Sequence, residues 1–302
     1  MNKTTVPLTA NEFIEQQLNA HLYELEEALN SDVLVFVGDL VGGVDDVIKN
    51  VIEQKRQDSK KYDKLTVILT TSGGFIEVVH RIVDTLRFHY KDGVIDFIIP
   101  NYAFSAGTVL AMSGDAIFMN YYSRLGPIDP QYETPEGRTV PALGYLIQYE
   151  RLLEKAKDGS ITLPEVQLML SFDQAELYKY EQARELSISL LKDWLVKYKF
   201  KNWTKTKTRG KTVTSAMKKK RAAEIAKQLN DTDKWHTHGY GISMEVLSKD
   251  LKVEIDDFST NQKLNDKIKE YTTLLDDYMS KMSQVGIVHV FRNYQVFHEH
   301  SH

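Results

Sequence analysis

The sequence predicts an α/β fold of repeated strand, turn and helix units around a parallel sheet. Apolar strands are expected at residues 32–40, 65–69 and 94–99, and each leads into a turn segment and then into a stretch of helical periodicity. The strands are nearly continuous apolar runs, as expected for strands that are buried on both faces. In such a fold the functional loops lie at the carboxyl ends of the strands.

Each element rests on a local pattern. Residues 11–30 carry apolar side chains at helical spacing and predict an amphipathic helix before the first strand. The strand and helix pairs then follow in the order 32–40 with 44–55, 65–69 with 76–89, and 94–99 with a helix that opens near Ser105. A fourth short strand is predicted at 116–119, and the turn-rich run 126–131 ends this section.

The second half of the chain is predicted to be mainly helical. Residues 143–198 have helical periodicity with a break at 157–164. Further helices are predicted at 221–229, 244–249 and 264–282. We therefore expect one domain over residues 1–203 and, over residues 204–302, a basic linker followed by an α-rich C-terminal region.

The charge balance argues against a general attraction to polyanions. The 302 residues include 38 Lys and Arg against 42 Asp and Glu, a formal net charge of −4, so we expect neither a nucleic-acid partner nor a membrane surface. Residues 204–221 carry eight basic residues and no acid. Because this run has no aromatic residue beyond the adjoining Trp203 and matches no nucleic-acid motif, we interpret it as a solvated linker.

Missing residue types and patterns exclude several chemistries. The chain has no cysteine, which excludes disulfides, thiol catalysis and thiolate metal sites. Residues 1–10 lack the basic-then-apolar pattern of a secretory signal, and no apolar stretch approaches the length of a membrane span. We therefore expect a cytoplasmic protein.

We also predict no cofactor and no catalytic metal. The histidines of the tail, residues 298–302, belong to an exposed terminus with too few fixed ligands for a metal site. No P-loop is present, so any ATP dependence would come from another chain.

The first candidate for a catalytic residue is Ser105, in the run Ala103-Phe104-Ser105-Ala106-Gly107-Thr108. A tight turn between a strand and a helix exposes a serine hydroxyl and points the free amides of the first helical turn at the reaction centre. Such a hydroxyl needs a base to remove its proton, and the oxyanion that forms needs backbone donors. The alternative is that Ser105 only caps the helix.

The second candidate element is Ser72-Gly73-Gly74, which follows the preceding strand. A glycine backbone can present an N–H group to a substrate carbonyl, although glycines after a strand also form plain turns. Two consecutive turns of one parallel sheet, one with paired glycines and one with a serine among small residues, together favour an acyl-transfer site.

Three motifs in order carry a resemblance to a known family. They are Thr71-Ser72-Gly73-Gly74, then Ala103-Phe104-Ser105-Ala106-Gly107-Thr108, then Leu125-Gly126-Pro127-Ile128-Asp129-Pro130-Gln131. The sequence resembles the serine dehydrogenase proteinase family, a soluble relative of signal peptide peptidase A and Clp protease. The resemblance covers roughly residues 30–200, with a weaker similarity at 235–243.

The resemblance implies a fold and a set of roles. It implies a ClpP/crotonase-like fold for residues 1–203, Ser105 as the nucleophile, and the Gly74 and Ala106 amides as the oxyanion hole, with Gly73 beside the substrate. It also implies a peptide or protein substrate and association into a ring or a smaller homo-oligomer.

The general base is less clear than the nucleophile. Clp proteases carry their base histidine in the segment that matches residues 123–130, where this sequence has no histidine. Signal peptide peptidases use a serine and lysine dyad, and Lys179 interrupts an apolar stripe in the helix after Ser171. A lysine on a buried face has a lowered pKa, which makes it a usable base. The alternative is that Lys179 reaches water by snorkelling.

Two further lysines and one histidine are candidates for the general base. Lys155 and Lys157 lie at a predicted solvated helix end. His238 matches a histidine of the family's later motif, but Gly239 stands where an acidic residue is expected. Asp129 is instead a candidate for orienting the base or accepting a substrate amide, but an aspartate in the run Pro127-Ile128-Asp129-Pro130 is expected to fix a turn.

We therefore predict a serine peptidase in which Lys179, or alternatively His238, activates Ser105. Two other functions stay open at this stage. One is a crotonase-like acyl-CoA enzyme, which shares the oxyanion hole but needs no serine nucleophile. The other is an inactive protease homologue that serves as an oligomeric scaffold.

Overall fold

The computed structural model describes residues 8–58, 61–128, 131–133, 139–206, 208–235 and 239–297. The helices are α1 Ala10–Leu29, α2 Val44–Lys55, α3 Ile76–His89, α4 Ala106–Met112, α5 Ala142–Lys157, α6 Leu163–Leu170, α7 Gln174–Trp194, α8 Ser215–Leu229, α9 Thr232–Trp235, α10 Met244–Lys249 and α11 Gln262–Lys281. A π-helical turn at Leu195–Lys199 extends α7, and a 3₁₀ turn at Phe258–Thr260 precedes α11.

The strands form one large sheet and two small ones. They are β1 Asp32–Val37, β2 Leu65–Thr70, β3 Ile95–Ile98, β4 Tyr102–Ala103, β5 Ala116–Met119, β6 Arg124–Leu125, β7 Gln131–Glu133, β8 Thr139–Pro141, β9 Ile242–Ser243, β10 Asp256–Asp257, β11 Gly286–Val290 and β12 Asn293–Phe297. Within the described ranges the large sheet has the order β10-β5-β3-β2-β1-β11-β12.

The parallel part of this sheet confirms the predicted α/β fold. Strands β1, β2, β3, β5 and β10 pair in parallel, with Val35 opposite Ile68 in the first pair. Helix α2 connects β1 to β2, and α3 connects β2 to β3, as the periodicity predicted. The carboxyl ends of the parallel strands therefore meet at one edge of the sheet.

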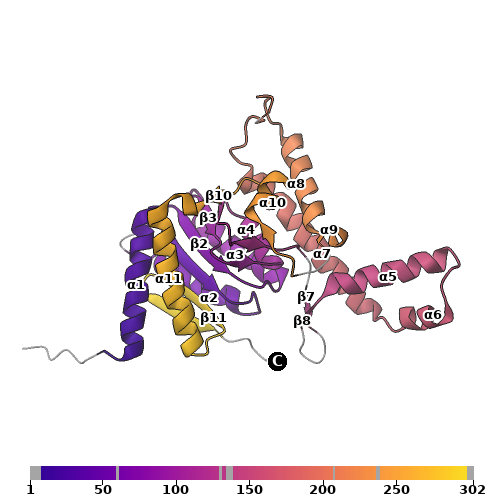
Figure 1. Cartoon of the computed structure of the whole chain (residues 1–302), viewed down its shortest axis with the longest axis horizontal. Helices are drawn as coiled ribbons and strands as arrows, with labels where there is room; N and C mark the ends of the chain where they lie inside the picture. The colour runs from indigo at the N-terminus through magenta and orange to yellow at the C-terminus, as the bar shows by residue number, and fades with distance from the viewer. Residues whose placement is uncertain are drawn as a thin grey trace, which may run out of the picture.

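Helices cover both faces of the sheet (Figure 1). On one face, Val33 and Val35 of β1 pack in a cluster with apolar residues of α1 and α11. On the other face, Leu34 and Phe36 pack in the larger core that includes α2, α3 and α4. Successive side chains of β1 thus pack alternately into two separate cores, and the strand is therefore apolar at nearly every position.

The region after residue 203 differs from the expected linker and α-rich tail. Lys205 is opposite Thr212 in an isolated antiparallel bridge, and α8 begins at Ser215, within the basic run. Strand β11 pairs antiparallel with β1, and β12 pairs with β11. The C-terminal region is therefore part of the large sheet. The pairing of β11 escaped prediction because its partner β1 lies about 250 residues earlier in the sequence, and β12 adds to β11 as the second strand of a hairpin.

Helices α5, α6 and α7 extend away from the sheet (Figure 1). Ala183, Leu186 and Leu190, in the second half of α7, pack against the main core. In the first half of α7, Leu177 and Tyr180 instead pack in a small cluster with Leu146 of α5. Among the described residues, no helix combines the length and the apolar character needed to cross a membrane.

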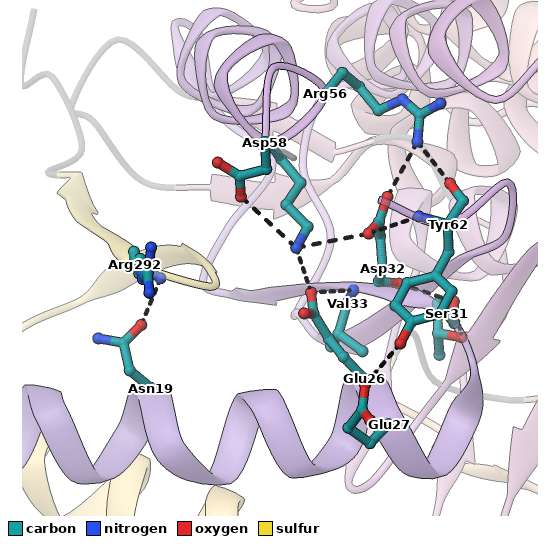
Figure 2. Close-up of polar contacts among 12 residues, drawn as sticks. Asn19, Glu26, Glu27, Ser31, Asp32, Val33, Arg56, Asp58, Tyr62 and Arg292 are labelled. Atoms are coloured by element: carbon teal, nitrogen blue, oxygen red, sulfur yellow. Dashed lines mark hydrogen bonds and ion pairs between the residues drawn. The ribbon is translucent and has the colours of Figure 1, made fainter. Parts of the chain in front are cut away.

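A buried ion cluster joins α1, β1 and α2 at the amino ends of the strands. Lys55 Nζ lies 2.8 Å from Glu26 Oε1 and 3.6 Å from Asp32 Oδ1, and all three side chains are buried. Asp32 also pairs with Arg56 at 3.2 Å, as Figure 2 shows, and accepts a hydrogen bond from the Tyr90 hydroxyl at 2.9 Å. Burial is the main reason why the pKa of Glu26 is raised, although Lys55 opposes this effect.

We predict that Lys55→Met destabilises the protein by about 3–5 kcal/mol, because it leaves two buried carboxylates without their central cation. Lys49→Met is the matched control on the same helix, since Lys49 is exposed and its contact with Glu53 is 4.0 Å long. The control should lose about 0.5 kcal/mol or less. Urea denaturation of both variants measures the difference, and equal small losses would contradict the importance of the cluster.

Candidate active site

Three loops meet at the carboxyl edge of the parallel strands. The amide of Leu40, after β1, donates to the carbonyl of Gly73, after β2, at 2.7 Å. Thr71 lies beside the segment that follows β3, because its amide donates to Tyr102 O at 3.1 Å and its carbonyl accepts from Phe104 N at 3.0 Å. The predicted glycine turn and the predicted serine turn are therefore neighbours.

Ser105 occupies an unusual backbone conformation. Its φ of 51° and ψ of −121° are rare for a residue with a Cβ atom, and it stands at the junction between β4 and α4. Its side chain is 2% exposed, and it makes no capping hydrogen bond to α4. The capping role is thus not observed. A strained turn between a strand and a helix is typical of a hydrolase nucleophile. The expected exposure of the Ser105 hydroxyl is not observed, because the Gly73 loop packs against this side chain.

The glycine loop lies directly against this serine. Gly73 has a φ of 117°, and a Cβ atom built on it would lie 2.8 Å from Ser105 Cβ and 3.4 Å from Ser105 Oγ. Gly74 has a φ of 139°, and its Cβ would lie 2.4 Å from the carbonyl oxygen of Leu40. Both positions exclude a side chain, for reasons of space as well as of backbone conformation.

The two amides expected to form an oxyanion hole flank Ser105. Ala106 is the first residue of α4, where backbone N–H groups have no partner within the helix. Among the described residues, no backbone carbonyl accepts from the amide of Gly74 or from that of Ala106. Both amides therefore have no backbone acceptor within the described part of the chain, and their joint use as an oxyanion hole stays a prediction.

Thr108 ties a third loop to the serine turn. Its hydroxyl oxygen lies 2.8 Å from Ala103 O and 2.9 Å from Gly126 O, and it accepts from Gly126 N at 2.9 Å. The side chain is fully buried. Thr108 stands in the motif that carries the resemblance, but its structural role was not predicted, since nothing in a local pattern shows which loop a hydroxyl will reach.

Segments from the C-terminal region complete the surroundings of the site. Strand β6 lies between β4 and β9, so that Leu125 is opposite both Ala103 and Ile242. Beyond β6, the amide of Ile128 donates to Leu229 O at 3.0 Å, and its carbonyl accepts from the Asn230 side chain at 2.8 Å. The weak similarity at 235–243 therefore leads into a strand of the candidate site.

The whole arrangement can be compared with known proteins. The family of ClpP-like SDH-type serine proteinases matches residues 44–216, more than half of the chain. The matched range contains the glycine loop, the Ser105 turn and the Gly126 loop. The chain belongs to this family. Its fold is accordingly ClpP-like, as the resemblance implied.

Two uncharacterised proteins of Methanocaldococcus jannaschii are also similar to this family member. One is 27% identical over 225 residues, which is 74% of the chain and 62% of that relative. The other is 29% identical over 191 residues, which is 63% of the chain and 51% of that relative. The chain thus spans between half and two thirds of the lengths of these relatives.

Solved structures give a more distant likeness. Two variants of the 1510-N membrane-bound stomatin-specific protease each give a TM-score of 0.42. The first is 14% identical and the match covers 77% of this chain and 81% of that one. The second, which is bound to a substrate peptide, is 15% identical and the match covers 74% of this chain and 72% of that one. A ClpP1 variant from Listeria monocytogenes gives 0.33 at 13% identity, over 55% of this chain and 77% of its own. Because these scores are low, the family assignment rests on the sequence match.

The structure brings together four of the predicted site residues, which are Ser105, Gly73, Gly74 and Ala106. It does not bury Lys179, whose side chain is exposed and makes no ion pair with another described residue. The expected burial is wrong because this part of α7 lies beyond the main core. Leu177 and Tyr180 face α5 there, and Lys179 lies on another side of the helix.

The rival base and the turn aspartate, His238 and Asp129, lie outside the described residues. Their chain neighbours are described. Ile242, which follows His238, pairs with β6, and Ile128, which precedes Asp129, is bonded to the end of α8. Within the described part of the chain, no group of three or more His, Cys, Asp or Glu is placed to hold a metal ion.

Sequence reasoning also missed an acidic residue at the site, Asp39. The Ser72 hydroxyl donates to the Asp39 carboxylate, which connects the loop after β1 to the glycine loop. The pKa of Tyr102, which stacks on Phe104, is raised mainly by burial and further by the charge of Asp39. The Asp39 carboxylate therefore contacts Ser72, which stands two residues before Gly74 in the glycine loop.

We predict that Gly73→Ala slows the reaction of Ser105 with a fluorophosphonate by about 100-fold, because the new methyl group would displace the serine or the loop. Gly42→Ala is the control, since Gly42 lies in a nearby loop with open space around the added methyl group. The control should react at the wild-type rate. Labelling rates, with melting temperatures to check folding, make the measurement, and equal rates for both variants would contradict the contact.

Proposed function

We propose that this protein is a serine peptidase with Ser105 as its nucleophile. The observation that carries the proposal is the strained, buried Ser105 turn in contact with the glycine loop. Membership of the ClpP-like SDH-type serine proteinases supports it. The absence of cysteine from the sequence leaves serine as the natural nucleophile for acyl transfer.

The proposed reaction uses the Ser105 turn and the glycine loop. A base takes the hydroxyl proton of Ser105 as its oxygen attacks the carbonyl carbon of a peptide bond. The amides of Gly74 and Ala106 donate to the oxyanion, the amine leaves with a proton, and water then releases the acyl group from Ser105. The rigid contact between the loops keeps the donors in place as charge develops, which is where such donors have most effect.

We predict that a fluorophosphonate labels Ser105 and no other residue, because only this serine combines the strained turn with adjacent free amides. Ser105→Ala should abolish labelling and peptide hydrolysis, whereas Ser72→Ala, in the loop after β2, should keep the nucleophile. Peptide mapping by mass spectrometry locates the adduct. Labelling that persists in Ser105→Ala rules out the proposed nucleophile, and retained thioester hydrolysis by that variant points to crotonase-like chemistry.

Exposure of Lys179 alters the balance between the two candidate bases. A lysine base depends on desolvation, which the single chain does not provide at Lys179. A neutral imidazole is available near pH 7 without burial, so His238 does not need such an environment. The pairing of Ile242 with Leu125 also keeps the segment after His238 next to the Ser105 turn.

We therefore predict that His238→Gln slows labelling of Ser105 by about 100-fold and that Lys179→Met leaves it unchanged. With a histidine base, the labelling rate should rise with pH through about 6.5 and then level off. Stopped-time labelling across pH 5–9, with circular dichroism as a folding control, measures both. Loss of labelling in Lys179→Met alone would assign the base to Lys179.

We also propose that the protein is a cytoplasmic homo-oligomer. Apolar side chains on the projecting helices support association, since Leu163, Leu170 and Tyr178 are 74%, 75% and 61% exposed. A second subunit that covered these helices would also bury the surroundings of Lys179. Analytical ultracentrifugation at micromolar concentrations should give a mass above the 34.7 kDa of one chain, and a monomer throughout would contradict association.

A further inference from the structure

The basic run has a defined shape that a solvated linker would lack. Residues 204–206 and 211–213 run antiparallel around one bridge between Lys205 and Thr212, and we call this pair of short segments the ribbon. In it Thr206 N donates to Lys211 O and Val213 N donates to Thr204 O, both at 2.9 Å. Gly210, with a φ of 58°, lies in its turn. The ribbon and the first turns of α8 stand away from the sheet at the top of Figure 1. We name residues 201–221 the basic arm.

Charge in this protein is strongly segregated toward the basic arm. The arm contains nine of the 38 basic residues and none of the 42 acidic ones. The other segments therefore carry 29 basic against 42 acidic residues, a net charge of −13. The near-neutral total hides a cationic projection on an anionic body, so the average charge is a poor guide to what the projection binds.

The basic side chains of the ribbon point to both of its faces. Lys205 is opposite Thr212, and Thr206 is bonded to Lys211, so that the two lysines lie on opposite faces of the ribbon. Arg209 lies in the turn between them, and all three basic side chains are exposed. None of the three forms an ion pair with another described residue.

This distribution of charge fits a groove better than a flat surface. A membrane or the acidic face of another protein would contact one face of the ribbon and leave the other in water. The major groove of B-form DNA is about 12 Å wide, accepts a two-stranded β-ribbon and has a phosphate chain along each wall. Neighbouring strands lie about 4.8 Å apart, so the ribbon with its side chains fits this width.

The polar residues of the arm suit phosphate contacts. Threonine alternates with the basic residues from Thr204 to Thr208, and Thr212 follows Lys211. Hydroxyl, lysine and arginine side chains are the usual donors to phosphate oxygens. Trp203 is half-buried and packs on Phe200, with ring centroids 5.5 Å apart, so the arm offers no exposed stacking platform of the kind that binds single strands.

We propose that the basic arm docks into the major groove of double-stranded DNA through contacts with the phosphate backbone. This proposal does not depend on the proposed peptidase activity. Helix α8 carries the arm at its start, and its end holds the Ile128 loop of the candidate site through Leu229 and Asn230. A duplex on the arm would therefore be held by the same helix that supports the site.

The test is fluorescence anisotropy of a labelled 20-base-pair DNA duplex titrated with the full chain at several salt concentrations. We expect a dissociation constant in the micromolar range, of order 10⁻⁶ to 10⁻⁴ M, and a log–log salt dependence with a slope of about −0.9 for each phosphate neutralised. A variant with Lys205→Glu, Arg209→Glu and Lys211→Glu should bind at least about tenfold more weakly, with a slope reduced by about three.

The matched control changes the same amount of charge elsewhere. Lys91→Glu, Lys249→Glu and Lys281→Glu replace three exposed lysines outside the arm, and this variant should keep both the affinity and the salt slope to within about twofold. Because the readout is binding, Ser105→Ala protein should behave as wild type, which separates this proposal from the catalytic one.

Several outcomes would overturn the proposal. An equal loss in the two triple variants means that the arm is not a local site. Equal affinity for duplex RNA, whose major groove is too narrow for the ribbon, argues against groove docking. Binding to phosphatidylserine vesicles without binding to DNA assigns the arm to a lipid surface. A change of sedimentation in the arm variant, with no DNA binding by wild type, assigns it to a second copy of the chain.

Discussion

The backbone at Ser105 takes a conformation that residues with a Cβ atom seldom adopt, and the close packing of the neighbouring loops constrains it. Gly107 lies so close to Thr71 that a Cβ atom on it would approach Thr71 Cγ2 to 2.3 Å, and one on Gly126 would approach Phe104 Cδ1 to 2.9 Å. At these two glycines a neighbouring side chain packs directly against the backbone. Side chains of any size would separate the loops, which explains the small residues in all three motifs.

Parts of the chain that carry no catalytic group are needed for this packing. The Gly126 loop is fixed from one side by the Thr108 hydroxyl and from the other by Asn230, which Arg184 of α7 contacts in turn at 3.0 Å. Strand β9 closes the small sheet beside the serine turn. The site is thus assembled from segments that precede α5 in the sequence and segments that follow α7.

The parallel strands and the serine and glycine turns could be predicted because local patterns determine them. Alternating strands and helices require neighbouring parallel strands, and their carboxyl ends then share one edge. What failed depended on distant contacts. The apolar stripe through Lys179 shows that one side of a helix is apolar, but not how far the core that covers it extends. Likewise, the composition of residues 204–221 gave no sign of the pairing between Lys205 and Thr212.

The position of β11 has a consequence for how the chain reaches this fold. Val35 of β1 is opposite His289 of β11, so β1 gains its second neighbour in the sheet from a segment near the other end of the described chain. Until that segment arrives, β1 presents an open, apolar edge, and α1 lacks the helix α11 against which it packs. Pairing over such a sequence distance is slow, and an open apolar edge invites pairing with other chains. Until β11 has been synthesised, β1 therefore lacks the strand that covers this edge in the folded protein.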